Sequence, residues 1–261
     1  MKSLQETILS IQNKYIQGLI ELNDYDFSTR QNIISKQPTF LFRGERTKWK
    51  ETKSTASRKN LLVSPTFDEI NYWISGLHKI SGQTLNNYSL YMFLRTVLNT
   101  DNVELIGGLL QHYEFDTSFI DLTSDINVAA FFASAQGDIG DIGQILIIPT
   151  SSIENRIFDL SKEFGNRPTR QKAYAILAPP ELDLKSDHFK KNYQLQVEEF
   201  ELTKEDKKIY DNPNLLSTMN DTVASSIFDW FESHIHDNHT ISILVKEYFT
   251  EKIDNLKKHC D

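Results

Sequence analysis

The chain has 261 residues, of which 39% are hydrophobic and 25% are charged, proportions that are usual for a globular protein. Its formal net charge of −8 argues against bulk electrostatic binding to nucleic acid or to an anionic membrane, but leaves room for a local basic cleft. The single Cys260 excludes an internal disulfide and indicates a reducing compartment. No run approaches the ~18 apolar residues of a membrane span, and the first residues lack the blocks of a signal peptide. We therefore expect a cytoplasmic protein with a single domain over residues 1–261.

Helix and strand signals alternate in the first third of the chain. Ser3 and Glu6 have capping-box spacing before apolar residues at intervals of three and four, which predicts an N-terminal helix over 3–23 that packs on the domain or forms a dimer seam. A strand over 39–43 follows, and alternation places Arg43 on the face opposite to Phe40 and Phe42. An inward-facing guanidinium needs an anionic partner, either a carboxylate of the protein or a phosphate of a ligand.

The stretch after Gly44 is basic from residue 45 to residue 60, and the glycine permits an unusual backbone angle or the close approach of another group. The basic stretch is expected to be a loop that is either simply solvated or closes over an anionic ligand. Helices are predicted over 64–77, 87–98 and 101–112, and an Ala- and Phe-rich helix over 127–136 with Asp125 as its N-cap.

Strand signals concentrate later in the chain. Short or apolar strands are predicted at 119–120, 144–149 and 173–177, and a half-buried strand at 195–202. Helices return after residue 212 and end with a helix over 244–258. The chain is therefore predicted to be α+β, with helices early and late around a small mixed or split sheet, a core over about 36–180 and a C-terminal helical part over about 203–261.

Polar side chains crowd into one stretch, residues 110–133, between apolar runs. Such crowding marks a helix cap, a turn or a site. We expect this stretch to meet Arg43 and Gly44 in space. Its polar members are Gln111, His112, Tyr113, Asp116, Thr117, Asp121, Thr123, Ser124, Asp125 and Asn127.

Three blocks together resemble the FRG domain family. The first is Phe42-Arg43-Gly44, and the second contains Gln111-His112-Tyr113, Thr117, Asp121, Thr123 and the helix around Ala129 to Ala133. The third is residues 167–174, in which Ala173 stands where the family more often has glycine. The resemblance covers roughly residues 38–178. The family is often found in bacterial or phage-related proteins, a setting in which an activity that modifies a macromolecule or depletes nucleotide would resemble that of a toxin or phage-defence effector.

A more distant similarity is to mono-ADP-ribosyltransferases, which share the order of an Arg-Gly strand end, a Ser/Thr-rich strand before an Ala/Phe helix, and a later strand bearing a glutamate. This similarity implies an ADP-ribosyltransferase-like core with NAD as cofactor, a macromolecular acceptor, and transferase or NAD glycohydrolase activity. The departure is Gln171 in place of the glutamate. Either Asp121 or Glu114 then supplies the charge that stabilises the oxocarbenium ion, or the protein binds a nucleotide without cleaving it.

The site residues implied by these similarities fall into two groups. The catalytic residues would be Arg43, His112, Asp121 and Gln171. The residues that bind the nucleotide would be Arg43, Gly44, Tyr113, Thr117, Thr123 and Ser124.

Other interpretations remain open at this point. The chain could be a non-enzymatic interaction module whose polar cluster is structural, with Asp121 as the buried ionic partner of Arg43 and with His112 and Tyr113 satisfying the end of a helix. A nuclease with His112 as base lacks a second carboxylate at a recognisable spacing. His234, His236 and His239 have the composition of a metal site, but their polar surroundings favour solvated histidines, and we predict no metal.

Overall fold

The computed structural model describes residues 1–26, 31–58, 96, 103–135, 137–153, 157–161, 166–178, 182–234 and 243–259. The helices predicted over 64–77 and 87–98 lie outside these residues, apart from Thr96. His236 and His239 lie outside them as well.

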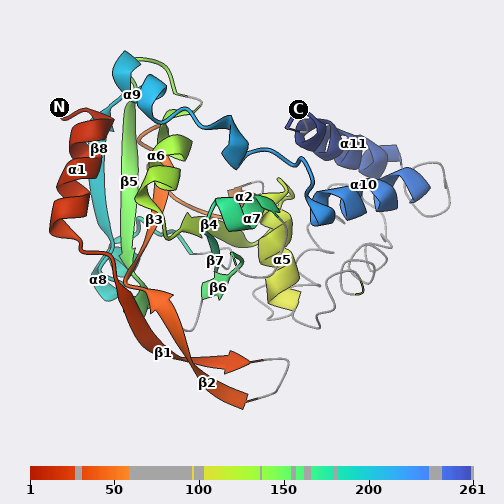
Figure 1. Ribbon diagram of the computed structural model, residues 1–261, viewed down its shortest axis with the longest axis horizontal. Helices are drawn as coiled ribbons and strands as arrows, with labels where there is room; N and C mark the ends of the chain where they lie inside the picture. Colours follow the sequence, from red (N-terminus) through yellow and green to blue (C-terminus); the bar gives the residue numbers. More distant parts are fainter. Residues whose placement is uncertain are drawn as a thin grey trace.

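A six-stranded sheet forms the centre of the protein (Figure 1). Every pairing between neighbouring strands in it is antiparallel, so the prediction of α+β is confirmed while that of a mixed sheet is wrong. A parallel pair would require a long crossover connection between its strands, and no pair of neighbouring strands that the structure describes in this sheet is parallel. The strand order is β6 (Ile157–Asp159), β7 (Ala173–Leu177), β4 (Phe119–Thr123), β3 (Phe40–Glu45), β5 (Ile142–Pro149) and β8 (Gln196–Glu201).

Alternation along the strands builds an apolar core on each face of the sheet. Phe42, Ile145 and Ile147 face one core, in which helices α1 (Leu4–Lys14) and α6 (Ile126–Ser134) cover the sheet. Leu41 and Leu146 face the other core, to which helix α8 (Asp187–Asn192) contributes. The prediction that Phe42 and Arg43 lie on opposite faces of β3 is confirmed, because Arg43 follows Leu41 by two residues and shares its face.

The sheet is almost divided between β3 and β4. These strands pair only at Phe42 and Thr123, whereas β3 pairs with β5 from Phe40 to Glu45. Beyond Phe42 the two strands separate, and the main-chain groups on that side need partners other than the neighbouring strand.

The predicted N-terminal helix is too long. Helix α1 ends at Lys14 with the expected capping box of Ser3 and Glu6, and residues 19–26 form strand β1 (Leu19–Asp26) instead. Strand β1 pairs with β2 (Gln31–Pro38) as a separate two-stranded sheet. Leu19 and Leu22 fit a helical period, whereas Ile20 and Leu22 fit an alternating one. The hydrogen bonds formed with β2 satisfy the main chain of this segment as a strand.

The remaining helices lie around the sheet. They are α2 (Thr55–Arg58), α5 (Val103–His112), α7 (Asn166–Arg170), α9 (Lys204–Ile209), α10 (Thr222–His234) and α11 (Ile243–Lys257), with short 3-10 turns η1 (Thr150–Ser152) and η3 (Pro213–Leu215). Helices α10 and α11 pack on one another, and both lie in the part of the chain predicted to be helical. None of the helices that the structure describes is long and apolar enough to cross a membrane.

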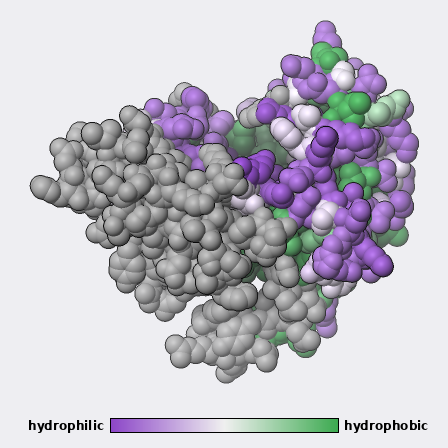
Figure 2. Space-filling model, turned by 180° about the vertical axis from the view of Figure 1, so that it is seen from behind, coloured by the Kyte–Doolittle hydropathy of each residue, from purple (hydrophilic) through white to green (hydrophobic). Residues whose placement is uncertain are grey.

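The described surface on the reverse side of the molecule is mostly hydrophilic, with hydrophobic groups interspersed among polar ones (Figure 2). Scattered apolar groups of this kind are usual for a folded chain and need no special explanation.

Candidate functional site

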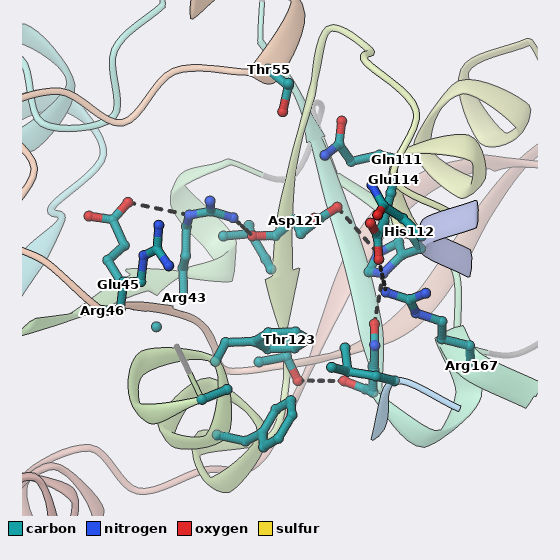
Figure 3. A pocket seen from close by; sticks show the side chains of 18 of the residues that line it. Arg43, Glu45, Arg46, Thr55, Gln111, His112, Glu114, Asp121, Thr123 and Arg167 are labelled. Atoms are coloured by element: carbon teal, nitrogen blue, oxygen red, sulfur yellow. Dashed lines mark hydrogen bonds and ion pairs between the residues drawn. The ribbon is translucent and has the colours of Figure 1, made fainter. Parts of the chain in front are cut away.

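A cavity of about 740 Å³ opens where β3 and β4 separate. Its walls come from β3 and the basic segment after it, from β4, from the ends of α5 and α6, from α7, and from the end of α11 (Figure 3). Six of the predicted site residues line it: Arg43, Gly44, His112, Asp121, Thr123 and Gln171. Tyr113, Thr117 and Ser124 do not. The expected meeting of the two sequence stretches is confirmed.

Arg43 bridges the gap between the separating strands. Its Nη1 donates a hydrogen bond of 2.8 Å to the main-chain oxygen of Asp121, and its Nε lies 3.4 Å from Oε1 of Glu45. The interpretation of Asp121 as the ionic partner of Arg43 is therefore corrected, because Asp121 contributes its main-chain oxygen and Glu45 contributes the carboxylate.

Glu45 is held from the other side by Lys185. Both side chains are at most 5% exposed and form an ion pair. Thr52 also donates to Glu45 Oε1 at 2.8 Å, and Lys185 donates to Gln144 and to the Trp49 main-chain oxygen. A buried carboxylate with this many donors is fixed in position, and it fixes the Arg43 guanidinium in turn.

Three side chains contact one another in a row, from Gln171 through His112 to Asp121. The Gln171 amide donates from Nε2 to the Leu215 main-chain oxygen at 2.7 Å, so its Oε1 faces His112 Nδ1 at 2.9 Å. This orientation requires the proton on Nδ1, because Oε1 can only accept. His112 Nε2 then faces Asp121 Oδ1 at 3.5 Å.

The contact between His112 and Asp121 leaves the facing polar atoms without a hydrogen bond between them. Within the described residues, His112 Nε2 and Asp121 Oδ1 are buried and have no hydrogen-bond partner. The Asp121 side chain is nevertheless 35% exposed, which leaves Oδ2 as the oxygen that can face the cavity. Unsatisfied buried polar groups are rare in folded proteins, and a catalytic role or a bound water or ion is among their explanations.

The cavity is basic although the chain is acidic. Its lining holds six arginine and lysine side chains, namely Arg43, Arg46, Arg58, Arg167, Lys252 and Lys258, against four carboxylates, namely Glu45, Glu114, Asp116 and Asp121. Burial and the nearby Arg43 lower the pKa of the Arg58 guanidinium. Two guanidinium groups that repel one another at a cavity wall favour an anionic ligand between them.

Three of the predicted site residues have their side-chain polar groups engaged elsewhere in the fold, and a fourth, Ser124, has its main-chain N–H engaged. Tyr113 is fully buried and donates to Asp221 at 2.7 Å, and burial and this carboxylate raise its pKa. Thr117 donates to Gln111, the Ser124 main-chain N–H donates to Lys172, and the Thr123 hydroxyl donates to the Gln171 main-chain oxygen at 2.7 Å.

Gly44 has a packing role. A Cβ atom at this position would lie 1.8 Å from the Ala129 main-chain oxygen, so α6 can approach β3 only because the residue is glycine. The close approach expected from the sequence is thereby confirmed. Asp125 is also confirmed as the N-cap of α6, since its side chain accepts from the Asn127 N–H.

Glu45, Arg58 and Arg167 also line the cavity, and the sequence-based prediction did not include them. Glu45 follows Arg43 by two residues and therefore shares its face of the strand, which is a signal that alternation offers. Arg58 belongs to the segment expected to be a loop, and Arg167 belongs to the third resemblance block, but nothing in either stretch marks these arginines out from their basic neighbours. No group of three metal-ligating side chains occurs among the described residues.

An α+β protein with a basic cavity at a divided antiparallel sheet is the class that this geometry defines. Residues 38–141 match the model of the FRG domain and are similar to that family over this span. The match begins where the resemblance predicted and ends before the third block. No match was found among curated proteins or solved structures.

Proposed function

We propose that the cavity binds a phosphate-bearing nucleotide, with NAD as the candidate, and that Asp121 assists cleavage of the bond between ribose and nicotinamide. The main support for this proposal is that the Arg43 and Arg58 guanidinium groups and the Asp121 carboxylate lie together in one basic cavity. Three features of the cavity support the proposal, and each corresponds to one part of such a ligand.

The phosphate part of the ligand would lie against Arg43 and Arg58. Planar guanidinium groups recognise phosphate through paired N–H donors, and the Glu45 anchor keeps Arg43 pre-organised for it. An anion at this place would also remove the repulsion that lowers the pKa of Arg58.

The base of the nucleotide would lie against exposed aromatic side chains. Trp49 and Phe132 line the cavity and are 44% and 36% exposed. Aromatic rings at a cavity wall give a base a stacking surface without requiring a particular base.

Asp121 would supply the negative charge that Gln171 lacks. Both polar groups of the Gln171 amide are engaged, with His112 and with Leu215, so we assign Gln171 and His112 as positioning residues for Asp121. A carboxylate beside the ribose stabilises the developing oxocarbenium ion electrostatically.

In the proposed reaction the bond between ribose C1′ and the nicotinamide nitrogen breaks, and nicotinamide leaves with the electron pair as a neutral molecule. An oxygen of water or of an acceptor forms the new bond to C1′ and releases its proton to Asp121 or to solvent. With water the products are ADP-ribose, nicotinamide and one proton.

The test is nicotinamide release by the full chain incubated with NAD, combined with thermal shifts for NAD, ADP-ribose and other nucleotides. Asp121→Asn should lower nicotinamide release by about 10²–10³-fold while leaving the ADP-ribose shift in place. Asp211→Asn, an exposed aspartate outside the cavity, is the matched control. Absence of release and of any nucleotide shift would favour the interaction module instead.

A further inference from the structure

We infer a second phosphate-binding site in the same cavity, formed by Arg167 and Lys258, with Arg167 on the opposite side of Asp121 from Arg43. This inference deepens the proposed function and rests on it only for the identity of the first ligand. Figure 3 shows the arrangement, with Arg43, Glu45 and Arg46 on one side of Asp121 and with His112, Glu114 and Arg167 on the other.

Arg167 is an under-satisfied buried cation. Its side chain is 5% exposed, and its Nη2 donates to Glu114 Oε1 at 3.3 Å. Its Nε and Nη1 are buried without a hydrogen-bond partner anywhere in the part of the chain that the structure describes. A guanidinium carries five N–H donors, and leaving several of them unpaired away from water is costly unless a ligand completes the set.

The carboxylate of Glu114 is shared between Arg167 and His259. Glu114 Oε1 lies 3.8 Å from His259 Nε2 as well as within reach of Arg167. Burial and the nearby Arg167 lower the pKa of His259, which keeps this imidazole neutral near pH 7 and able to donate or accept a hydrogen bond.

Glu114 itself has a backbone φ of 67°, in the left-handed region that residues with a side chain seldom adopt. Strained backbone of this kind persists where the surrounding structure enforces it and is frequent at ligand sites. The strain here places the Glu114 carboxylate between Arg167 and His259.

Lys258 supplies a second cation that solvent and ligand can reach. It is exposed, lines the cavity, and donates to Asn255 Oδ1 at 2.9 Å, which directs its ammonium group. Besides burial, Arg167 and Lys258 both lower the pKa of His259, so the two cations lie near the same imidazole. A rigid guanidinium fork combined with an ammonium group matches a phosphate, which offers several acceptor oxygens to both.

The position of this site defines what it would hold. Because Asp121 lies between the two cationic groups, the reacting centre would have an anion on each side. The second phosphate is therefore either a phosphate of the nucleotide that ADP-ribose lacks, such as the additional phosphate of NADP, or a phosphate presented by an acceptor molecule.

The experiment is titration of the full chain with inorganic phosphate, with and without saturating ADP-ribose, followed by calorimetry and by the melting temperature. Lys258→Gln should weaken phosphate binding by about tenfold, the effect of losing one charge-assisted hydrogen bond. Lys257→Gln should change it by less than about twofold, because Lys257 points to Glu232 and does not line the cavity.

Arg167 is tested with its charge partner removed as well. The double variant Arg167→Gln with Glu114→Gln avoids a stranded buried carboxylate, and a melting curve without ligand confirms its fold. In the folded double variant the phosphate-dependent shift should be lost.

Two comparisons distinguish a phosphate of the nucleotide from a phosphate of an acceptor molecule. A phosphate shift that adds to that of ADP-ribose supports an acceptor phosphate, and a preference for NADP over NAD that Lys258→Gln removes supports a phosphate of the nucleotide. The inference is overturned if Lys258→Gln and Lys257→Gln bind phosphate equally, or if ADP-ribose displaces all bound phosphate. A Lys258-dependent phosphate site without any nucleotide shift would support this inference while refuting the proposed function.

Discussion

The Arg43 guanidinium donates a 2.8 Å hydrogen bond to the main-chain oxygen of Asp121, across the gap that opens after the single pair joining β3 to β4. The side chain thus satisfies a carbonyl that a neighbouring strand would otherwise occupy. Glu45 contacts Arg43 and is itself paired with the buried Lys185. The separation of β3 and β4 therefore depends on this network of charged side chains.

Arg43→Lys should therefore destabilise the fold. A single ammonium group cannot reproduce the two directed contacts with Asp121 and Glu45, and we expect a loss of about 1–3 kcal/mol in the free energy of unfolding. Urea denaturation followed by circular dichroism measures this loss.

The control is Arg58→Lys, the same exchange in the same cavity. The hydrogen bond that Arg58 donates goes to Thr55 on the surface, so its unfolding free energy should change by no more than about 0.5 kcal/mol. Equal unfolding midpoints for both variants would contradict the bridging role of Arg43.

Gly44→Ala should be strongly destabilising. The added methyl group would lie 1.8 Å from the Ala129 main-chain oxygen, and relief requires α6 to move away from β3. Overpacking of this kind costs about 1–3 kcal/mol or more. Gly18→Ala, whose new methyl would meet only the Thr39 hydroxyl at 3.3 Å, should be much milder, and comparable chemical denaturation midpoints for the two would refute the argument.

Asp206→Asn tests the anchoring of the N-terminal helix. The Asp206 carboxylate is fully buried and accepts from the Leu4 and Gln5 N–H groups and from the N–H and hydroxyl of Thr203. An amide would direct donors at other donors, and we expect a loss of about 2–3 kcal/mol in unfolding free energy. Glu6→Gln, which changes an exposed acceptor of the same helix, should lose less than about 1 kcal/mol, and a larger loss there would show that capping by Asp206 is not dominant.

Two tyrosines should give the protein an alkaline instability. Burial and a neighbouring carboxylate raise the pKa of Tyr113 beside Asp221 and of Tyr174 beside Asp159 above the ordinary value of 10.0. The folded state therefore holds these protons more tightly than the unfolded state. Their contribution is complete below pH 10 and declines as pH rises above it, by up to about 1.4 kcal/mol per pH unit for each tyrosine.

The measurement is the urea midpoint at several pH values between 8 and 11.5 for the native chain, Tyr113→Phe and Tyr174→Phe. Each variant should lose stability less steeply above pH 10 than the native chain does. Parallel pH profiles for all three proteins would rule out these hydroxyl groups as the cause.

Local signals predicted much of the fold because they are settled within a few residues. The capping box at Ser3, the N-cap at Asp125 and the strand around 144–149 depend on short-range hydrogen bonds and on alternation, and all three were found. The hairpin of β1 and β2 was missed because its apolar spacing also fits a helix, and pairing with residues 31–38 decides between the two.

The candidate site was only partly accessible to the same reasoning. Arg43, His112, Asp121 and Gln171, which the resemblances name together, all line one cavity. Which of them face outward could not be foreseen, because the engagement of Gln171 depends on the Leu215 carbonyl, 44 residues further along the chain. Contacts at such separations follow from the tertiary fold and not from local pattern.

The engagement of Gln171 with His112 changes where an active homologue should be sought. If an amide at this place serves only to orient an imidazole, then loss of the acid there says little about whether a chain is an enzyme. The informative comparison is between sequences that keep an acidic residue opposite that imidazole and those that replace it.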